Sequence, residues 1–107
     1  MDYSKLSDFD INLRVAEIVV DYDCISRLPY TDMAVHWGDG ANWYVFNPCN
    51  NPADAWPIIT SNRIGIVPGT ATDKWAAHHG DWDIAIADVN PLRAAMIIFL
   101  MMQDSRK

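Results

Sequence analysis

An apolar segment that begins at Leu92 and ends at Gln103 sets the strongest limit on how this chain folds. Apart from Arg93, its side chains are almost wholly apolar. Asn90 and Pro91 stand directly before it, and this pair is typical of a helix N-cap followed by the first helical position. A helix that is apolar nearly all round must be covered on several sides, by its own chain or by a partner.

The same segment also predicts a homo-oligomer. Ala94 and Ala95 would let another element approach closely, while Ile97 and Ile98 fill volume. We therefore expect the helix over residues 92–103 to expose apolar surface on more than one side and to support self-association.

A second asparagine–proline pair, Asn51 and Pro52, predicts a central helix. Asp54 would complement the helix dipole in the first turn. Pro57 is expected either to kink this helix or to mark a fresh start, because a proline inside a helix lacks a backbone N–H and clashes with the preceding turn. The helix should end by Asn62.

The N-terminal region predicts another helix, over residues 8–20. Ser7 is the expected N-cap, and Asp10 follows in the position of a capping box. Leu6 and Ile11 are placed to form a hydrophobic staple across this helix start.

Apolar and aromatic runs between the helices predict antiparallel strands. Residues 33–37 and 42–46 flank a glycine-rich turn and predict a hairpin, whereas residues 21–32 are expected to be loop. Three further runs predict a meander, with a turn at 79–81 between its last two strands and with Trp82, Ile84 and Ile86 on one buried face; they are residues 63–67, 74–78 and 82–87.

The chain is therefore expected to form one domain over residues 1–107. We predict an α+β fold in which an antiparallel sheet, made of hairpin and meander, packs with N-terminal, central and C-terminal helices in a sandwich-like arrangement. The sheet should lie under the C-terminal helix. Most of the five tryptophans are expected in the core or at its edge.

Charge and composition exclude several classes of partner. The formal net charge is −6, and the eight Lys and Arg residues are scattered along the chain. This pattern argues against direct binding of nucleic acid. The longest apolar run is too short to span a bilayer. Two cysteines and the absence of a secretory pattern predict free thiols and a cytoplasmic location.

Candidate chemistry is sparse, and we predict no cofactor. His78, His79 and Asp81, with His36, are the best metal ligands by type, but neighbouring residues on a strand point to opposite faces. Cys49 precedes a helix start, which would favour a thiolate, although a small buried side chain is the ordinary interpretation. No phosphate-binding, dinucleotide-binding or serine-hydrolase motif occurs.

A polar loop followed by a tryptophan is the candidate interaction surface. Its residues are Asn47, Asn50, Trp56 and Pro57. The alternative is that the asparagines serve turns and the helix cap. Trp56 could belong either to the core or to an interface.

Three segments carry a family resemblance: residues 1–8, 46–59 and 90–102. The most specific motifs are Pro-Ala-Asp-Ala-Trp-Pro at 52–57 and Asn-Pro-Leu-Arg-Ala-Ala-Met at 90–96. With these motifs the chain resembles the NinX-like proteins of lambdoid phages and prophages. The resemblance implies an origin among early or recombination-region phage genes and a cytoplasmic setting in the bacterial host. It carries no catalytic residues over and implies no activity.

Three functions remain open. The first is a phage or prophage accessory protein that has no catalytic activity and binds a host or phage protein, because the chain is small, acidic and rich in tryptophan. The second is an acidic decoy or modulator of a nucleic-acid enzyme. The third is a small metal-binding enzyme.

Overall fold

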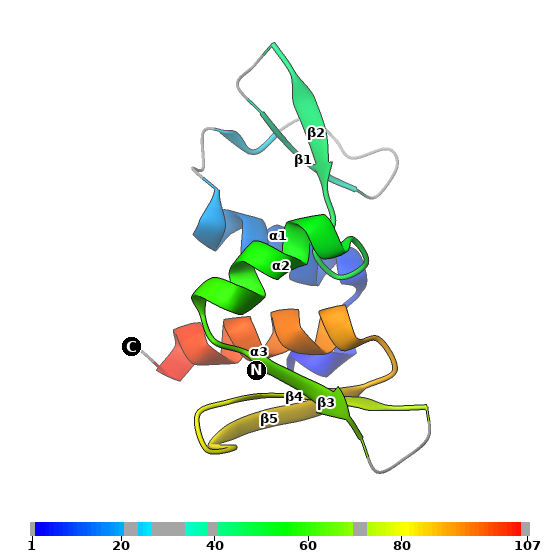
Figure 1. Cartoon of the computed structure of the whole chain (residues 1–107). Coiled ribbons are helices and arrows are strands. Elements are labelled where there is room, and N and C mark those ends of the chain that lie inside the picture. Colours follow the sequence, from blue (N-terminus) through cyan, green and yellow to red (C-terminus); the bar gives the residue numbers. More distant parts are fainter. Residues whose placement is uncertain (1, 21–23, 27–33, 39–40, 70–72, 106–107) are drawn as a thin grey trace.

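Helices and antiparallel strands alternate along the chain in the predicted α+β class. The computed structural model describes residues 2–20, 24–26, 34–38, 41–69 and 73–105. Within these residues lie a short 3-10 helix, three α-helices and five strands (Figure 1). They are η1 (Tyr3–Lys5), α1 (Asp8–Val19), β1 (Val35–Gly38), β2 (Trp43–Phe46), α2 (Pro52–Ser61), β3 (Gly65–Pro68), β4 (Trp75–His79), β5 (Ile84–Asp88) and α3 (Pro91–Ser105).

Helix α3 lies at the centre, with α1 and α2 on one side and β4 and β5 on the other (Figure 1). Its side chains from Ala94 through Leu100 are all buried, and so is Met102. The prediction of a helix covered on several sides is confirmed, and the cover comes from the same chain. The expectation that residues 92–103 expose apolar surface was wrong, because those neighbours take up the apolar faces.

Side-chain caps fix where α1 and α3 begin. Ser7 Oγ accepts the N–H of Asp10 at 3.1 Å, as the capping pattern predicts. Asn90 Oδ1 accepts the N–H groups of Leu92 at 2.9 Å and Arg93 at 3.3 Å, so it caps α3. Both helix starts are therefore confirmed, because the capping signal is local in the sequence. No helix among the described residues combines the length and apolar character needed to cross a membrane.

Helix α2 runs without interruption through Pro57. Asn51 Oδ1 accepts the N–H of Ala53 at 3.0 Å, and Asn62 closes the other end. The predicted start and end are confirmed, but a fresh start at Pro57 was wrong. Pro57 leaves the carbonyl of Ala53 without its usual helical donor, and both residues are exposed, so water can bond to that carbonyl.

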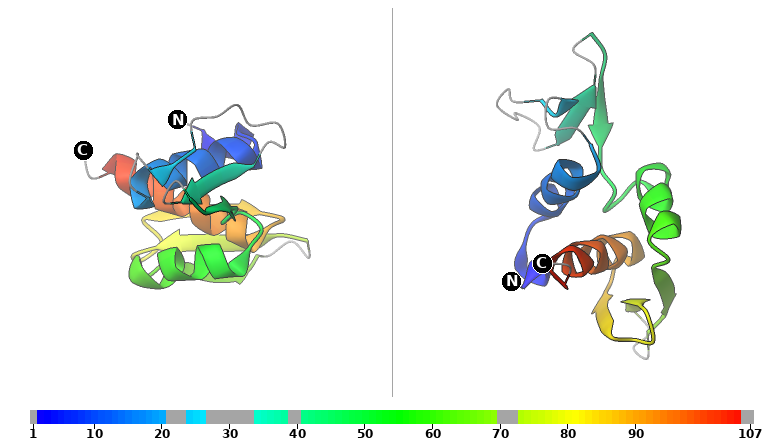
Figure 2. Two further views of the ribbon diagram at one scale, coloured as in Figure 1. Left: turned by 90° about the horizontal axis from the view of Figure 1, so that it is seen from above. Right: turned by 90° about the vertical axis from the view of Figure 1, so that its left-hand side faces the viewer.

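The strands form two separate antiparallel sheets rather than one. Strands β1 and β2 make a hairpin, and β3, β4 and β5 make a meander in that order. Ile66, Ala77 and Ile86 lie side by side across the meander, and Ala77 is fully buried. The meander packs on α3, as predicted, while the hairpin projects from the far side of the helices (Figures 1 and 2).

The boundary between β4 and β5 differs from the prediction. Strand β4 includes His79, and the turn spans residues 80–83. Trp82 lies in this turn with φ of 67° and is 52% exposed, so it does not continue the face of Ile84 and Ile86. The predicted position of Trp82 in a strand was wrong, because the tight turn requires residues with positive φ.

The hairpin is confirmed, with strands close to the predicted runs. Residues 39–40 of its turn lie outside the described residues, as does most of the loop predicted for 21–32. Of that loop, residues 24–26 are described, and Ile25 forms an isolated bridge with Trp37 on the outer side of β1.

The tryptophans lie at the surface and not in the core. All five are between 38% and 62% exposed. The expectation that most of them lie in the core or at its edge was wrong, because the interior is filled by aliphatic residues together with Phe46, Phe99 and Met96. The protein therefore presents far more aromatic surface than its composition alone suggests.

Candidate functional site

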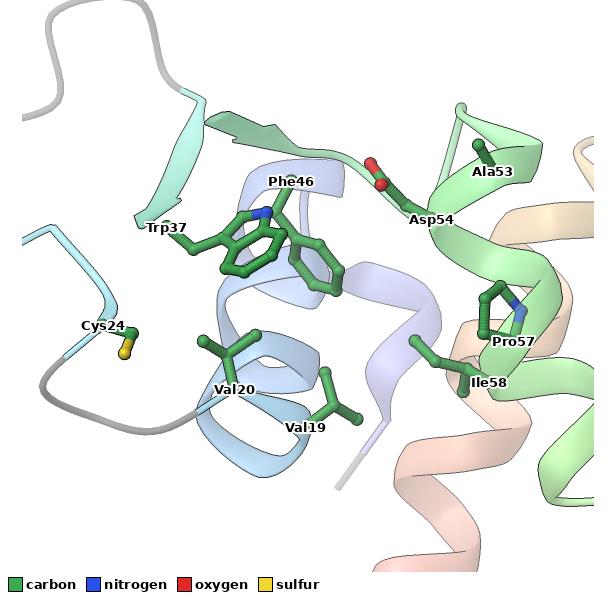
Figure 3. A pocket seen from close by; sticks show the side chains of 9 residues that line it. All are labelled: Val19, Val20, Cys24, Trp37, Phe46, Ala53, Asp54, Pro57 and Ile58. Atoms are coloured by element: carbon green, nitrogen blue, oxygen red, sulfur yellow. The ribbon is translucent and has the colours of Figure 1, made fainter. Parts of the chain in front are cut away.

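A groove opens between the end of α1, the hairpin and α2. Its volume is about 520 Å³. Apolar side chains supply most of the lining, and among the described residues Asp54 supplies the one charge (Figure 3). The lining residues are Val19, Val20, Cys24, Trp37, Phe46, Ala53, Asp54, Pro57 and Ile58.

The walls of the groove come from segments far apart in the sequence. Val19 and Val20 approach from the end of α1, while Trp37 and Phe46 lie on the hairpin (Figure 3). Ile58 closes the groove from α2. Such a hollow can accept an apolar side chain of a ligand, since it would remove apolar surface of both partners from water.

An asparagine network holds the loop between β2 and α2 against the helices. Asn12 is only 5% exposed, and its Nδ2 donates to Asn47 Oδ1 at 2.8 Å. Asn12 Oδ1 accepts the N–H of Cys49 at 3.0 Å. Asn47 N–H in turn donates to Asp54 Oδ2 at 2.9 Å, so the network reaches the edge of the groove.

Asn90 joins the same network to the start of α3. Its Nδ2 donates to the carbonyl of Cys49 at 2.7 Å and to Asn50 Oδ1 at 3.1 Å. Asn50 Nδ2 donates to Asn47 Oδ1 and to Asp8 Oδ2, each at 3.1 Å. The two asparagine–proline segments of the sequence thus meet in space.

Arg93 extends this arrangement to the N-terminus. Its Nη1 lies 2.6 Å from Asp8 Oδ1, and its Nε lies 3.2 Å from Asp88 Oδ2. Its Nη2 donates to the carbonyls of Ser4 at 3.0 Å and Leu6 at 2.7 Å. One guanidinium therefore ties η1, α1 and the end of β5 to α3.

Most of the chain matches a known family, and the matched part contains both the groove and the network. A family model described as Bacteriophage P22, NinX matches residues 2–103. The chain belongs to the NinX family. The resemblance expected from the sequence is confirmed. Comparisons with curated proteins and with solved structures give no match.

The four residues predicted as an interaction surface divide between two roles in this NinX-family fold. Pro57 lines the groove, whereas Trp56 is 62% exposed beside it and is absent from the lining. Asn47 and Asn50 bond to Asn12, Asp8 and Asn90 in the network. Trp56 does not belong to the core, and its place in an interface stays a prediction.

Cys49 is unsuited to nucleophilic chemistry in the folded NinX-family chain. It is fully buried, and burial together with the nearby charge of Asp8 raises the pKa of its thiol to about 12. The ordinary interpretation of a small buried side chain is confirmed. The following helix start does not favour a thiolate here, because desolvation opposes the charged form more strongly.

The His78 side chain of β4 packs against neighbouring residues. His78 stacks on Trp82 with ring centroids 3.9 Å apart and 18° between the planes. A Cβ built on Gly65 would lie 2.2 Å from His78 Nε2, so the imidazole also lies against the backbone of β3. Within the described part of the chain, no three or more His, Cys, Asp or Glu residues group as metal ligands would.

Several site residues of this NinX-family chain carried no recognised signal in the sequence. Val19, Val20 and Phe46 look like ordinary core residues, because only the three-dimensional arrangement leaves the groove between them. Asn12 offered one available signal, a polar residue on the buried face of an amphipathic helix. Arg93 offered another, as the charge at the start of an apolar segment.

Proposed function

We propose that this NinX-family chain is an accessory protein that binds a host or phage protein. The observation that carries the proposal is the open apolar groove of about 520 Å³ with exposed aromatic side chains around it. We infer that it works in the bacterial cytoplasm without direct contact to nucleic acid or membrane, in keeping with its net charge of −6.

The lining of the groove suits a protein partner. Val19 and Trp37 line it and remain exposed, which leaves apolar surface that a partner could cover. Aromatic side chains are enriched at the centres of protein interfaces, where they bury large areas with little loss of side-chain freedom. Asp54 adds a carboxylate that would favour a basic residue at the edge of the partner's contact.

Affinity capture with matched variants tests this proposal. Val19→Lys places a charge inside the groove, whereas Val89→Lys places the same charge at an exposed position outside the lining. We expect tagged wild type and Val89→Lys to recover the same specific companion from phage-producing cells. Val19→Lys should lose that companion, because binding would bury the added ammonium group.

The outcome that contradicts the proposal is a companion retained by Val19→Lys, or wild type recovered without any specific companion. Trp56→Ala provides a second test. Because Trp56 is exposed, this variant should remain folded, and loss of the companion would extend the binding surface to the outer side of α2.

An acidic decoy for a nucleic-acid enzyme is the weaker alternative. Mimicry of a phosphate backbone requires free carboxylates arrayed on one surface. Here Asp8 and Asp88 pair with Arg93, and Asp54 accepts the N–H of Asn47. These carboxylates take part in internal bonds, and that favours a protein-binding groove over charge mimicry.

A further inference from the structure

Strand β2 forms an edge of the hairpin, and no described strand pairs with its outer side. Its side chains Trp43, Tyr44 and Val45 are all exposed. The hairpin projects from the helices, and β2 lies at its margin (Figures 1 and 2). An exposed apolar edge strand is a template for pairing with another strand.

The backbone of β2 offers hydrogen-bonding groups to a second strand. The carbonyl of His36 accepts the N–H of Ser26 at 2.9 Å, so the peptide groups of His36 point away from β2. His36 lies opposite Val45 in the antiparallel register. Val45, and Trp43 two residues away, therefore direct their N–H and C=O groups away from β1, while those of Tyr44 point toward β1.

The edge also lacks the usual protection against pairing. Natural edge strands are commonly guarded by lysine, other charges or proline. No charged residue occurs between residues 41 and 53, although the chain as a whole carries a net charge of −6. Two copies can thus approach along β2 without placing like charges against each other.

We propose that β2 pairs antiparallel with β2 of a second copy of this chain. The strand is self-complementary about a two-fold axis at Tyr44. With Tyr44 opposite the partner's Tyr44, each Trp43 faces a Val45 of the other copy, and every outward N–H meets an outward C=O. The aromatic and β-branched pair then forms twice on one face, an arrangement that stabilises antiparallel strands.

This contact differs from self-association through residues 92–103, most of whose apolar side chains the structure buries. It also goes beyond the proposed binding of another protein in the groove, because Val19, which lines the groove, takes no part in the β2 contact. A four-residue edge provides a small interface, and small interfaces give weak association. The dimer should therefore depend on protein concentration.

Light scattering over a series of concentrations tests the pairing. We expect the mass of wild type to rise from 12.1 kDa toward twice that value. Val45→Pro removes an outward N–H without removing a bond within the hairpin, and it should stay at 12.1 kDa throughout. Val45→Thr keeps the N–H and the β-branched shape, so it should associate as wild type does.

Hydrogen exchange of single amides gives a second readout, which also reports on folding. Protection of the Trp43 and Val45 amides should increase with concentration. The Tyr44 amide points toward β1 and should stay protected at all concentrations, including in Val45→Pro if the hairpin remains folded. A monomeric mass throughout, with Trp43 and Val45 exchange independent of concentration, would overturn the proposal.

Charge variants at Tyr44 test the register and do not depend on the proline variant. Tyr44→Lys brings two ammonium groups together at the two-fold axis and should weaken self-association by about tenfold or more. Mixing Tyr44→Lys with Tyr44→Glu should restore a dimer containing one copy of each. Failure of the mixture to associate would exclude this register. If the Trp43 and Val45 amides of wild type gain protection from exchange only when a different protein is present, self-pairing is excluded.

Discussion

At the scale of single residues, Asn12 shows how a polar side chain can be required inside an apolar helix face. Both ends of its amide are bonded, to Asn47 and to the backbone of Cys49. These partners lie more than thirty residues away. Helix caps such as Ser7 could be predicted because donor and acceptor are close in sequence, but the role of Asn12 could not.

Asn12→Ala should lower the free energy of unfolding by about 1–3 kcal/mol, because it leaves the buried N–H of Cys49 without its acceptor. Urea denaturation measures this change. Asn50→Ala is the matched control at an exposed position, and it should lose less because water replaces the missing bonds. If both variants lower the free energy of unfolding equally, the buried bonds of Asn12 stabilise the fold no more than the exposed bonds of Asn50.

At the scale of elements, Pro57 makes helix α2 less stable at the point where the helix lines the groove. Pro57 occupies a helix interior, where a proline removes one backbone bond. The sequence predicted both ends of this helix, since its caps are local signals. It left open whether the helix would continue with a kink at Pro57 or start afresh there, because continuation depends on packing against α3 and on solvent around the freed carbonyl.

Pro57→Ala should raise the free energy of unfolding by about 1–2 kcal/mol, because an interior proline costs about 3 kcal/mol and restricts the unfolded chain by up to about 1 kcal/mol. Pro52→Ala is the control, since a proline at the first helical position replaces no helical donor. We expect Pro52→Ala to leave the free energy of unfolding nearly unchanged or slightly lower. A clear loss of stability in Pro57→Ala would mean that contacts of the ring outweigh the missing hydrogen bond.

The strand boundaries of the meander were also predicted only in part. Alternation of apolar residues predicted the meander and its packing on α3. It misplaced Trp82, because a tryptophan that follows Gly80 and Asp81 resembles the first residue of a strand. The observed turn instead has positive φ at Gly80 and at Trp82. An alternation of apolar and polar residues carries no information about φ.

At the scale of the whole molecule, Arg93 connects segments that the sequence keeps apart. Its side chain is 13% exposed and bonds to η1, to Asp8 of α1 and to Asp88 of β5. The predicted fold class rested on the order of helices and strands. The groove and the partners of Arg93 depend on how those elements meet, so neither could be predicted from the order of helices and strands.

Arg93→Met should lower the free energy of unfolding by about 3 kcal/mol, because it leaves Asp88 Oδ2 and the carbonyl of Leu6 without their donor. Arg93→Lys should lie between this variant and wild type, since an ammonium cannot reach all partners of the planar guanidinium. Arg14→Met is the exposed control and should change stability by less than about 0.5 kcal/mol. Thermal and urea unfolding of the three variants check the order.

The central position of α3 has a consequence for synthesis of the chain. Helices α1 and α2 and the meander leave the ribosome before the helix on which they pack. Until α3 emerges, their apolar faces have no common surface to cover, so stable packing must wait for the last element. A nascent chain arrested before residue 91 should therefore remain sensitive to protease along most of its length and become resistant once α3 is released.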